Sequence, residues 1–167
     1  MPEWIPSTRS AKGRLALTAL EEFGTRGYEA VNVVDLAHTA GVTTGSLYHH
    51  FGSKLGLYGV VREEAERRAL DRMEGAAAAR AEDGPAAAAR AALLVGFDYV
   101  VRRGFTRLLG EGHPDRGDDP IEAFLSTLTD ADDVPVARLL LAAWRAALAA
   151  VADGAPVERV RSALAAF

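Results

Sequence analysis

The sequence predicts an all-α protein of about nine helices. Apolar residues recur at spacings of three and four along most of its 167 residues. Glycine and proline separate these periodic segments, and no stretch alternates apolar and polar residues for long enough to form a strand. Apolar residues make up 49% of the chain, which is enough to build a sizeable buried core. We therefore expect a helical protein with one large or two small domains.

The first helix is predicted after an N-terminal arm over residues 1–6, which contains two prolines. Ser7 or Thr8 can cap this helix, and Gly24 together with Gly27 is expected to end it. Its buried stripe is expected to consist of Ala16, Ala19, Leu20 and Phe23.

Residues 31–51, VNVVDLAHTAGVTTGSLYHHF, indicate two short helices joined by a tight turn. Asn32 can cap the first of them, with an acidic residue three positions later as in a capping box. Gly41 can adopt the left-handed conformation that ends a helix, and Thr43 or Thr44 can cap the next one. The apolar positions of the pair are Val33, Leu36, Ala37, Ala40, Leu47 and Phe51. This is the spacing of a helix-turn-helix, although any helical hairpin packed in a core has a similar pattern.

The remaining helices are placed by their breakers and caps. The Gly84-Pro85 pair and Gly104 bound one helix, and residues 110–120 form the clearest loop. One helix is expected from residue 53 through Met73 into the alanine-rich segment that follows it. Later helices are expected at 85–103, 105–109, 120–127, 133–153 and from residue 156 onward. Asp132 or Asp133 is expected to start the long helix that ends at residue 153. We expect two domains, residues 1–55 and residues 56–167.

The formal net charge of −4 is unevenly placed along the chain. Arg9, Lys12 and Arg14 lie near the start of the first helix, and Lys54 opens the fourth. Most of the acidic excess lies later, in Asp115, Asp118, Asp119, Asp130, Asp132 and Asp133. A weakly basic head on an acidic body is compatible with DNA binding, because only phosphate-facing cations release counterions.

The region around the helical pair closely resembles the DNA-binding domain of the tetracycline-repressor (TetR) family of bacterial transcriptional regulators. The resemblance covers about a third of the chain and extends over FGTRGYEAVNVVDLAHTAGVTTGSLYHHFGSKLGLY. The matching positions are Phe23, Gly27, Tyr28, Leu36, Ala37, Ala40, Gly41, Val42, Thr43, Gly45, Leu47, Tyr48, Phe51, Ser53 and Lys54. It implies a repressor that binds a palindromic double-stranded DNA operator as a homodimer and is released by a small-molecule effector.

The resemblance makes residues 43–50 the recognition helix. The residues expected at the DNA are Asn32, Thr43, Thr44, Gly45, Ser46, Tyr48, His49, His50 and Lys54. Ser46 and His49 face away from Leu47 and could reach base edges, whereas Tyr48 and His50 are expected at phosphates. Gly45 would let the backbone approach DNA closely. Lys54 is poorly placed for its own helix dipole, which a phosphate partner would explain.

Two departures from the family pattern weaken the expected DNA contacts. Val31 stands where the family often has threonine, and Val34 where it often has arginine or lysine. The recognition helix also contains no arginine or asparagine, the strongest bidentate readers of guanine and adenine. The alternative function is therefore a helical ligand-sequestering or protein-interaction module with weakened DNA binding.

The C-terminal half is expected to hold the effector pocket and the dimer interface. Pocket candidates are Phe97, Tyr99, Arg103, Phe105, Phe124 and Trp144, with Tyr99, Arg103 or His113 as polar anchors. Each aromatic side chain could equally be ordinary core. In the resembled family the last two long helices of each subunit form a four-helix interface. The residues that fit this role are Leu140, Trp144, Leu148, Val157, Val160 and Leu164.

Other chemistry finds little support in the sequence. The chain has no cysteine, and its four histidines (His38, His49, His50 and His113) lack the spacing of a metal site. No catalytic motif occurs, so we expect no enzyme, metal or cofactor. No apolar run approaches about 20 residues and no signal-peptide core is present, so we expect a cytoplasmic protein without a membrane partner.

Overall fold

The computed structural model describes residues 9–115, 117–129 and 135–167, and this part of the chain contains helices and no strand. The α-helices are α1 (Ala11–Ala30), α2 (Val33–Thr39), α3 (Thr44–Phe51), α4 (Lys54–Ala78), α5 (Pro85–Arg103), α6 (Thr106–Gly110), α7 (Pro120–Ser126), α8 (Val136–Ala152) and α9 (Val157–Leu164). A 3-10 turn, Ala81–Asp83, precedes α5. The predicted all-α class is confirmed.

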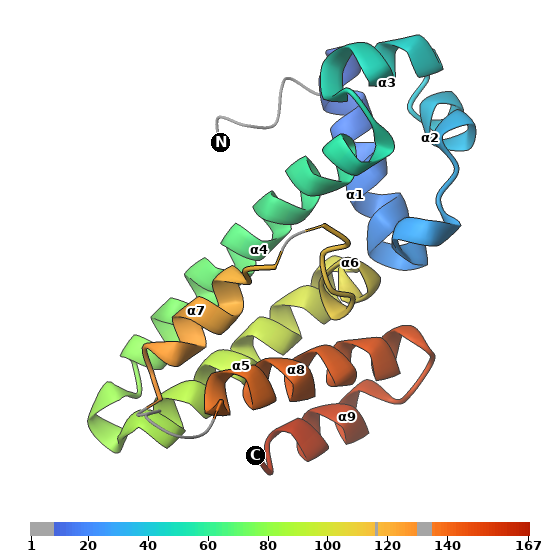
Figure 1. Ribbon diagram of the computed structural model, residues 1–167. Helices are drawn as coiled ribbons and strands as arrows, with labels where there is room; N and C mark the ends of the chain where they lie inside the picture. Colours follow the sequence, from blue (N-terminus) through green and yellow to red (C-terminus); the bar gives the residue numbers. More distant parts are fainter. Residues whose placement is uncertain (1–8, 116, 130–134) are drawn as a thin grey trace.

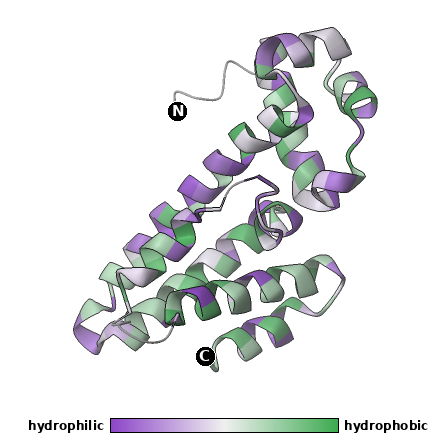
Figure 2. Cartoon of the chain, viewed as in Figure 1, coloured by the Kyte–Doolittle hydropathy of each residue, from purple (hydrophilic) through white to green (hydrophobic). Residues whose placement is uncertain are grey.

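Helices α1, α2 and α3 form a head at one end of the molecule, and α4 runs from this head into a bundle with the later helices (Figure 1). Helix α4 packs on α1 and α3 in the head and most extensively on α5 in the bundle. The apolar segments of the bundle helices face one another (Figure 2). The buried residues join into one continuous core that extends from α1 to α9.

Helix α1 begins later than predicted, and of the two glycines predicted to end it only Gly27 interrupts the helix. Ser10 caps it by accepting the Gly13 N–H at 3.0 Å, whereas Ser7 and Thr8 lie outside the described residues. Gly24 does not end the helix: it is buried in it, and a Cβ there would collide with the Gly104 carbonyl of the α5–α6 turn. Gly27 breaks the helix, because its φ of 77° is open to glycine and rarely to other residues.

The predicted caps of the two short helices are confirmed. The Asn32 carboxamide oxygen accepts the Val34 N–H at 2.7 Å, and the Thr43 hydroxyl oxygen accepts the Ser46 N–H at 3.2 Å. Between them Gly41 has a φ of 65°, which ends α2. These local bonds set the angle at which α3 leaves the turn.

Helix α4 carries a buried polar network that the sequence did not indicate. Arg62 and Glu66 belong to a mostly polar stretch of the sequence, yet each is only 1% exposed. The Arg62 guanidinium donates to the Glu66 carboxylate at 2.8 Å and to the Tyr58 hydroxyl at 2.9 Å. It also donates to the Leu108 carbonyl of α6. The network therefore ties α4 to α6 where the head meets the bundle.

Glu64 lies next to this network and is expected to make the protein less stable as the pH becomes acidic. Burial alone would raise the pKa of Glu64, but hydrogen bonds from Arg67 and Arg68 outweigh burial and leave the pKa below its ordinary value of 4.5. Its stabilising contribution is thus complete above pH 4.5 and is lost as the pH falls through the lowered folded-state value. We expect Glu64→Gln to flatten the fall in thermal melting temperature below pH 4.5. Equal slopes for the variant and the parent protein would contradict this.

The C-terminal helices follow the predicted order. The described part of α8 begins at Val136, and the predicted start at Asp132 or Asp133 lies outside the described residues. Helix α9 follows Pro156 as expected. Within the described ranges, no helix is both long enough and apolar enough to span a membrane.

Candidate nucleic-acid interface

Helix α3 buries one face and exposes the other. Leu47 is fully buried against α1 and α4, and Phe51 is half-buried beside it. Tyr48 is 53% exposed, and His49 and His50 are also exposed. Of the other predicted contacts, Asn32, Thr43 and Gly45 are exposed, whereas Thr44, Ser46 and Lys54 are half-buried. The structure therefore gathers the predicted residues on and around one short helix at the tip of the head.

Gly45 is a glycine that the fold itself does not require. Its φ is not in the left-handed region, and a Cβ at this position would have only the Thr43 hydroxyl oxygen nearby, at 3.7 Å. Glycine in a helix interior costs roughly 0.5–1 kcal/mol relative to alanine. An exposed helical glycine without an internal partner is consistent with close approach of an external surface to the first turn of α3.

Arg14 fixes the helix-turn-helix to α1. Its Nε donates to the Ala40 carbonyl at the end of α2 at 3.0 Å, and its Nη1 donates to the Arg9 carbonyl at 2.9 Å. The sequence analysis grouped Arg14 with the cations available to DNA. The structure gives it an intramolecular role instead, because its guanidinium satisfies a carbonyl that the helix end leaves open.

Lys54 has an intramolecular partner that explains its position at the start of α4. Its Nζ lies 4.3 Å from the centroid of the Tyr28 ring, a cation–π contact. The Tyr28 ring packs on Tyr58 with centroids 4.9 Å apart, and the Tyr28 N–H donates to the Glu111 carboxylate at 3.4 Å. The contact with Tyr28 orients Lys54 without neutralising its charge, so the charge is still available to a phosphate.

The histidines do not form a metal centre. The rings of His49 and His50 lie 5.1 Å apart, and His113 lies next to the Tyr58 ring in the bundle. Over the described ranges, no group of three or more histidine, aspartate or glutamate side chains is placed to hold a metal ion.

Of the six predicted pocket residues, Arg103 and Phe105 line one hollow together, next to α1. Phe97 and Trp144 are fully buried, and the Trp144 indole N–H donates to the Leu93 carbonyl at 3.1 Å. Phe105 is also buried, with the Tyr99 ring 6.5 Å and the Arg103 guanidinium 5.7 Å from its ring centroid. Phe124 is half-buried against the core. Sequence alone could not separate core from cavity, because both favour the same aromatic residues.

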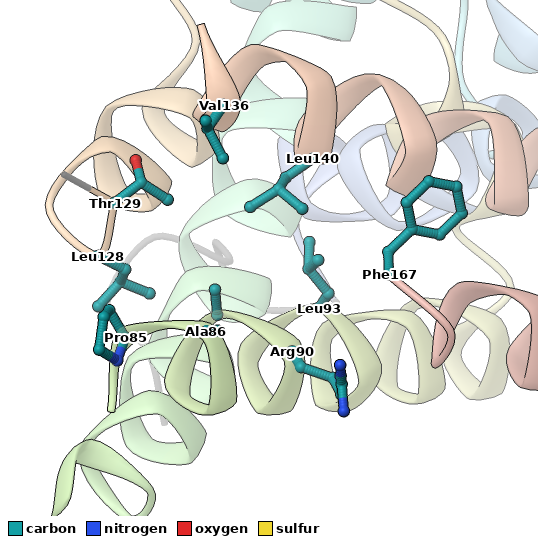
Figure 3. A pocket seen from close by; sticks show the side chains of 10 residues that line it. Pro85, Ala86, Arg90, Leu93, Leu128, Thr129, Val136, Leu140 and Phe167 are labelled. Carbon is teal, nitrogen blue, oxygen red and sulfur yellow. The ribbon is translucent and has the colours of Figure 1, made fainter. Parts of the chain in front are cut away.

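A cavity of about 290 Å³ lies elsewhere in the bundle, between α5, the turn after α7 and α8 (Figure 3). Its lining residues are Pro85, Ala86, Ala89, Arg90, Leu93, Leu128, Thr129, Val136, Leu140 and Phe167. Sequence analysis did not identify this site, since its walls come from segments far apart in the chain. The spacing of its α5 residues by three and four positions was the one available signal.

The proposed dimer residues divide into two groups. Trp144, Leu148 and Leu164 are buried in the chain's own core, where a second subunit cannot reach them in this arrangement. Leu140, Val157 and Val160 are half-buried. The outer face of α8 instead presents Leu139, which is 59% exposed, with the exposed alanines Ala142 and Ala146 along the same face.

Comparison with known sequences places the head in a recognised group. A sequence model described as "Bacterial regulatory proteins, tetR family" matches residues 17–61. The transcriptional repressor KstR2 of Mycobacterium tuberculosis is 49% identical over 45 residues, which is 27% of this chain and 22% of KstR2. The transcriptional activator FasR of Mycolicibacterium smegmatis is 47% identical over 47 residues, 28% of this chain and 22% of FasR. The matches thus span about a fifth of these curated relatives.

Two solved structures resemble the whole chain. One, described as the molecular basis for control of antibiotic production by bacterial hormones, has a TM-score of 0.64 and 25% identity, covering 95% of this chain and 96% of the other. The other, a putative TetR-family transcriptional regulator from Rhodococcus sp., has a TM-score of 0.54 and 17% identity, covering 96% of each chain. The second likeness concerns the fold alone.

Proposed function

We propose that the chain is a transcriptional repressor of the TetR family, because the family's sequence model and the repressor KstR2 both match its head. In this proposal it acts in the cytoplasm, binds a palindromic operator as a homodimer, and is released when a small molecule binds the C-terminal bundle. The observation that carries the proposal is the exposed face of α3, which is capped by Thr43 and backed by fully buried Leu47. Such a helix can enter a major groove while its other face holds it to the protein.

The residues around α3 divide by the contact each can make. In the first turn of α3 the Ser46 N–H is held by Thr43, and the backbone N–H groups of Thr44 and Gly45 before it suit a phosphate. Ser46 and His49 are the proposed base readers. Tyr48, His50 and Lys54 are the proposed phosphate contacts. The recognition helix carries no arginine or asparagine that could form a bidentate contact with a base. We therefore expect modest discrimination, at most about 1–3 kcal/mol for each base pair that is read directly.

We assign DNA binding and effector binding to two different domains. Residues 1–55 would read DNA, and residues 56–167 would bind the effector and the second subunit. Helix α4 joins them without interruption, so a shift of α4 in the bundle moves the whole head. A dimer along the exposed Leu139 face of α8 would set the distance between two such heads. An effector that binds one spacing better than another would then change operator affinity.

The deciding experiment is selection of random duplex DNA by the purified protein, followed by binding to the selected sequence and to its isolated half-site. We expect enrichment of a palindrome and much weaker binding to the half-site. A reporter gene behind the selected sequence then separates repression from activation, which matters because KstR2 is a repressor and FasR an activator. Failure to enrich any sequence would contradict the proposal.

Lys54 provides a quantitative test of phosphate binding. Lys54→Met keeps an apolar stem beside the Tyr28 ring and removes the charge. Because each phosphate contact contributes about 0.9 to the slope of log K against log salt concentration, we expect the slope to fall by about 1.8 per dimer. Tyr28→Leu is the matched control, since it removes the cation–π contact and leaves the charge. An unchanged slope in Lys54→Met would remove this residue from the interface.

The second candidate function is a ligand-sequestering or protein-interaction module that has lost DNA binding. The observation in its favour is Val34, which is 63% exposed on α2 where the family often carries a cation. Tyr48→Ala and Lys54→Met distinguish the two functions. A repressor loses operator affinity with its melting temperature unchanged, whereas a sequestering module keeps its activity in both variants.

A further inference from the structure

We propose that the 290 Å³ cavity between α5, α8 and the turn after α7 is a binding site for an apolar monocarboxylate, whose carboxylate is held by Arg90. The site itself is argued from the geometry of the cavity, whereas its role as the effector site rests on the proposed function.

The walls of the cavity are almost entirely apolar. Leu93 and Leu140 face one another from α5 and α8, with Leu128, Val136 and Phe167 around them (Figure 3). Small-molecule pockets commonly have volumes of about 300–1,000 Å³. A cavity of about 290 Å³ therefore suits a small ligand with an apolar body rather than a nucleotide or a large cofactor.

Arg90 gives the site its chemical preference. It is the one charged residue among the described lining residues, and it lies at the α5 edge of the cavity (Figure 3). The two arginines that share a neighbouring hollow with Arg90 pair internally, Arg80 with Asp83 and Arg161 with Asp98. Within the described ranges, Arg90 has no hydrogen bond or ion pair. A guanidinium that borders an apolar cavity and has no partner among the described residues favours a carboxylate that it can bind with two parallel hydrogen bonds.

The lining has one other polar side chain among the described residues, Thr129, and its hydroxyl already donates a hydrogen bond within the protein. The Thr129 hydroxyl donates to the Leu125 carbonyl at 3.3 Å, so its proton is not available to a ligand. Arg90 is exposed, so a carboxylate bound to it keeps part of its hydration while the apolar body enters the cavity. These features favour an amphipathic anion over a neutral polar molecule.

A ligand in this cavity would contact both α5 and α8, which pack on each other. Val136 and Leu140 lie on α8 itself. On the α5 side, Leu93 lines the cavity while its carbonyl accepts the indole N–H of Trp144 on α8. Occupancy of the cavity would therefore act directly on the α5–α8 contact. Because α8 carries the proposed dimer face, the site is placed to change the spacing of the heads.

The test follows the fluorescence of Trp144, whose indole N–H donates to the carbonyl of the lining residue Leu93. The chain has two tryptophans, so Trp4→Phe leaves Trp144 as the only one. In this background we would titrate decanoate and, as the neutral control of equal chain length, decan-1-ol, following Trp144 fluorescence and melting temperature without DNA. We expect saturable binding of decanoate and weaker binding of decan-1-ol.

Two variants and one control assign the site. Loss of a charge-assisted hydrogen bond predicts that Arg90→Gln weakens decanoate binding by about tenfold or more and leaves decan-1-ol unchanged. Arg102→Gln, an exposed arginine of α5 outside this cavity, should change neither. Ala86→Trp should fill the cavity and abolish binding of both compounds. An unchanged decanoate affinity in Arg90→Gln, equal affinity for both compounds, or no decanoate binding by the parent protein would each overturn the proposal.

The same samples separate this inference from the proposed function. Enrichment of a palindrome without decanoate binding would leave the repressor proposal standing and remove the carboxylate site. Arg90-dependent decanoate binding without enrichment of any DNA sequence would leave the site standing and remove the repressor proposal.

Discussion

Replacing Arg62 by leucine should destabilise the protein by about 3–5 kcal/mol, the usual cost of removing one partner of a buried ion pair. The substitution removes the guanidinium that lies 2.8 Å from the Glu66 carboxylate and leaves that carboxylate in a buried site. It also removes the donors to the Tyr58 hydroxyl and the Leu108 carbonyl. Urea denaturation followed by circular dichroism would measure the effect, with the parent protein in the same buffer.

The control for Arg62 lies one and a half turns further along α4. Arg67 pairs with Glu64 at 2.8 Å, but its side chain is 52% exposed, so Arg67→Leu should cost far less stability than Arg62→Leu. The double variant Arg62→Leu with Glu66→Leu should recover much of the loss, because replacing both buried partners by apolar groups is often nearly neutral. Equal costs for Arg62→Leu and Arg67→Leu would show that the buried network contributes nothing special to stability.

Replacing Gly45 by leucine should abolish specific DNA binding while the fold persists. The only atom near a Cβ at this exposed position is the Thr43 hydroxyl oxygen at 3.7 Å, so the new side chain meets no obstacle within the protein. Toward DNA it would hold the first turn of α3 away from the backbone. Specific binding commonly exceeds non-specific binding by about 10³-fold or more, and we expect a loss of that size for the selected operator.

Gly75 supplies the matched control for Gly45. It is an exposed helical glycine of α4, it has nothing within 4 Å of a Cβ, and it lies far along α4 from α3. Gly45→Leu and Gly75→Leu should both raise stability, since glycine in a helix interior is unfavourable by roughly 0.5–1 kcal/mol relative to alanine. DNA affinity, measured by fluorescence anisotropy, should fall in the first variant alone. Retained operator affinity in Gly45→Leu would contradict the proposed docking of α3.

The head of the protein could be predicted from sequence because its determinants are local. Asn32 and Thr43 cap helices through bonds to residues two or three positions away, and Gly41 supplies a conformation that other residues rarely adopt. The exposed face of α3 follows from helical periodicity once Leu47 is known to be buried. Gly24 shows the limit of such reasoning, because its role is a close approach to Gly104, 80 positions along the chain.

The bundle was decided by tertiary structure. Arg62 belongs to a polar stretch of the sequence, yet its guanidinium donates to the Leu108 carbonyl of α6, 46 positions away. Trp144 suited a pocket or a dimer interface, and the structure buries it and pairs it with the Leu93 carbonyl, 51 positions away. Periodicity shows that a helix has an apolar face, but it does not show which helix will cover that face. The sequence by itself therefore determined the helices and the reading head, whereas packing between distant segments determined the buried ion pair and the cavity.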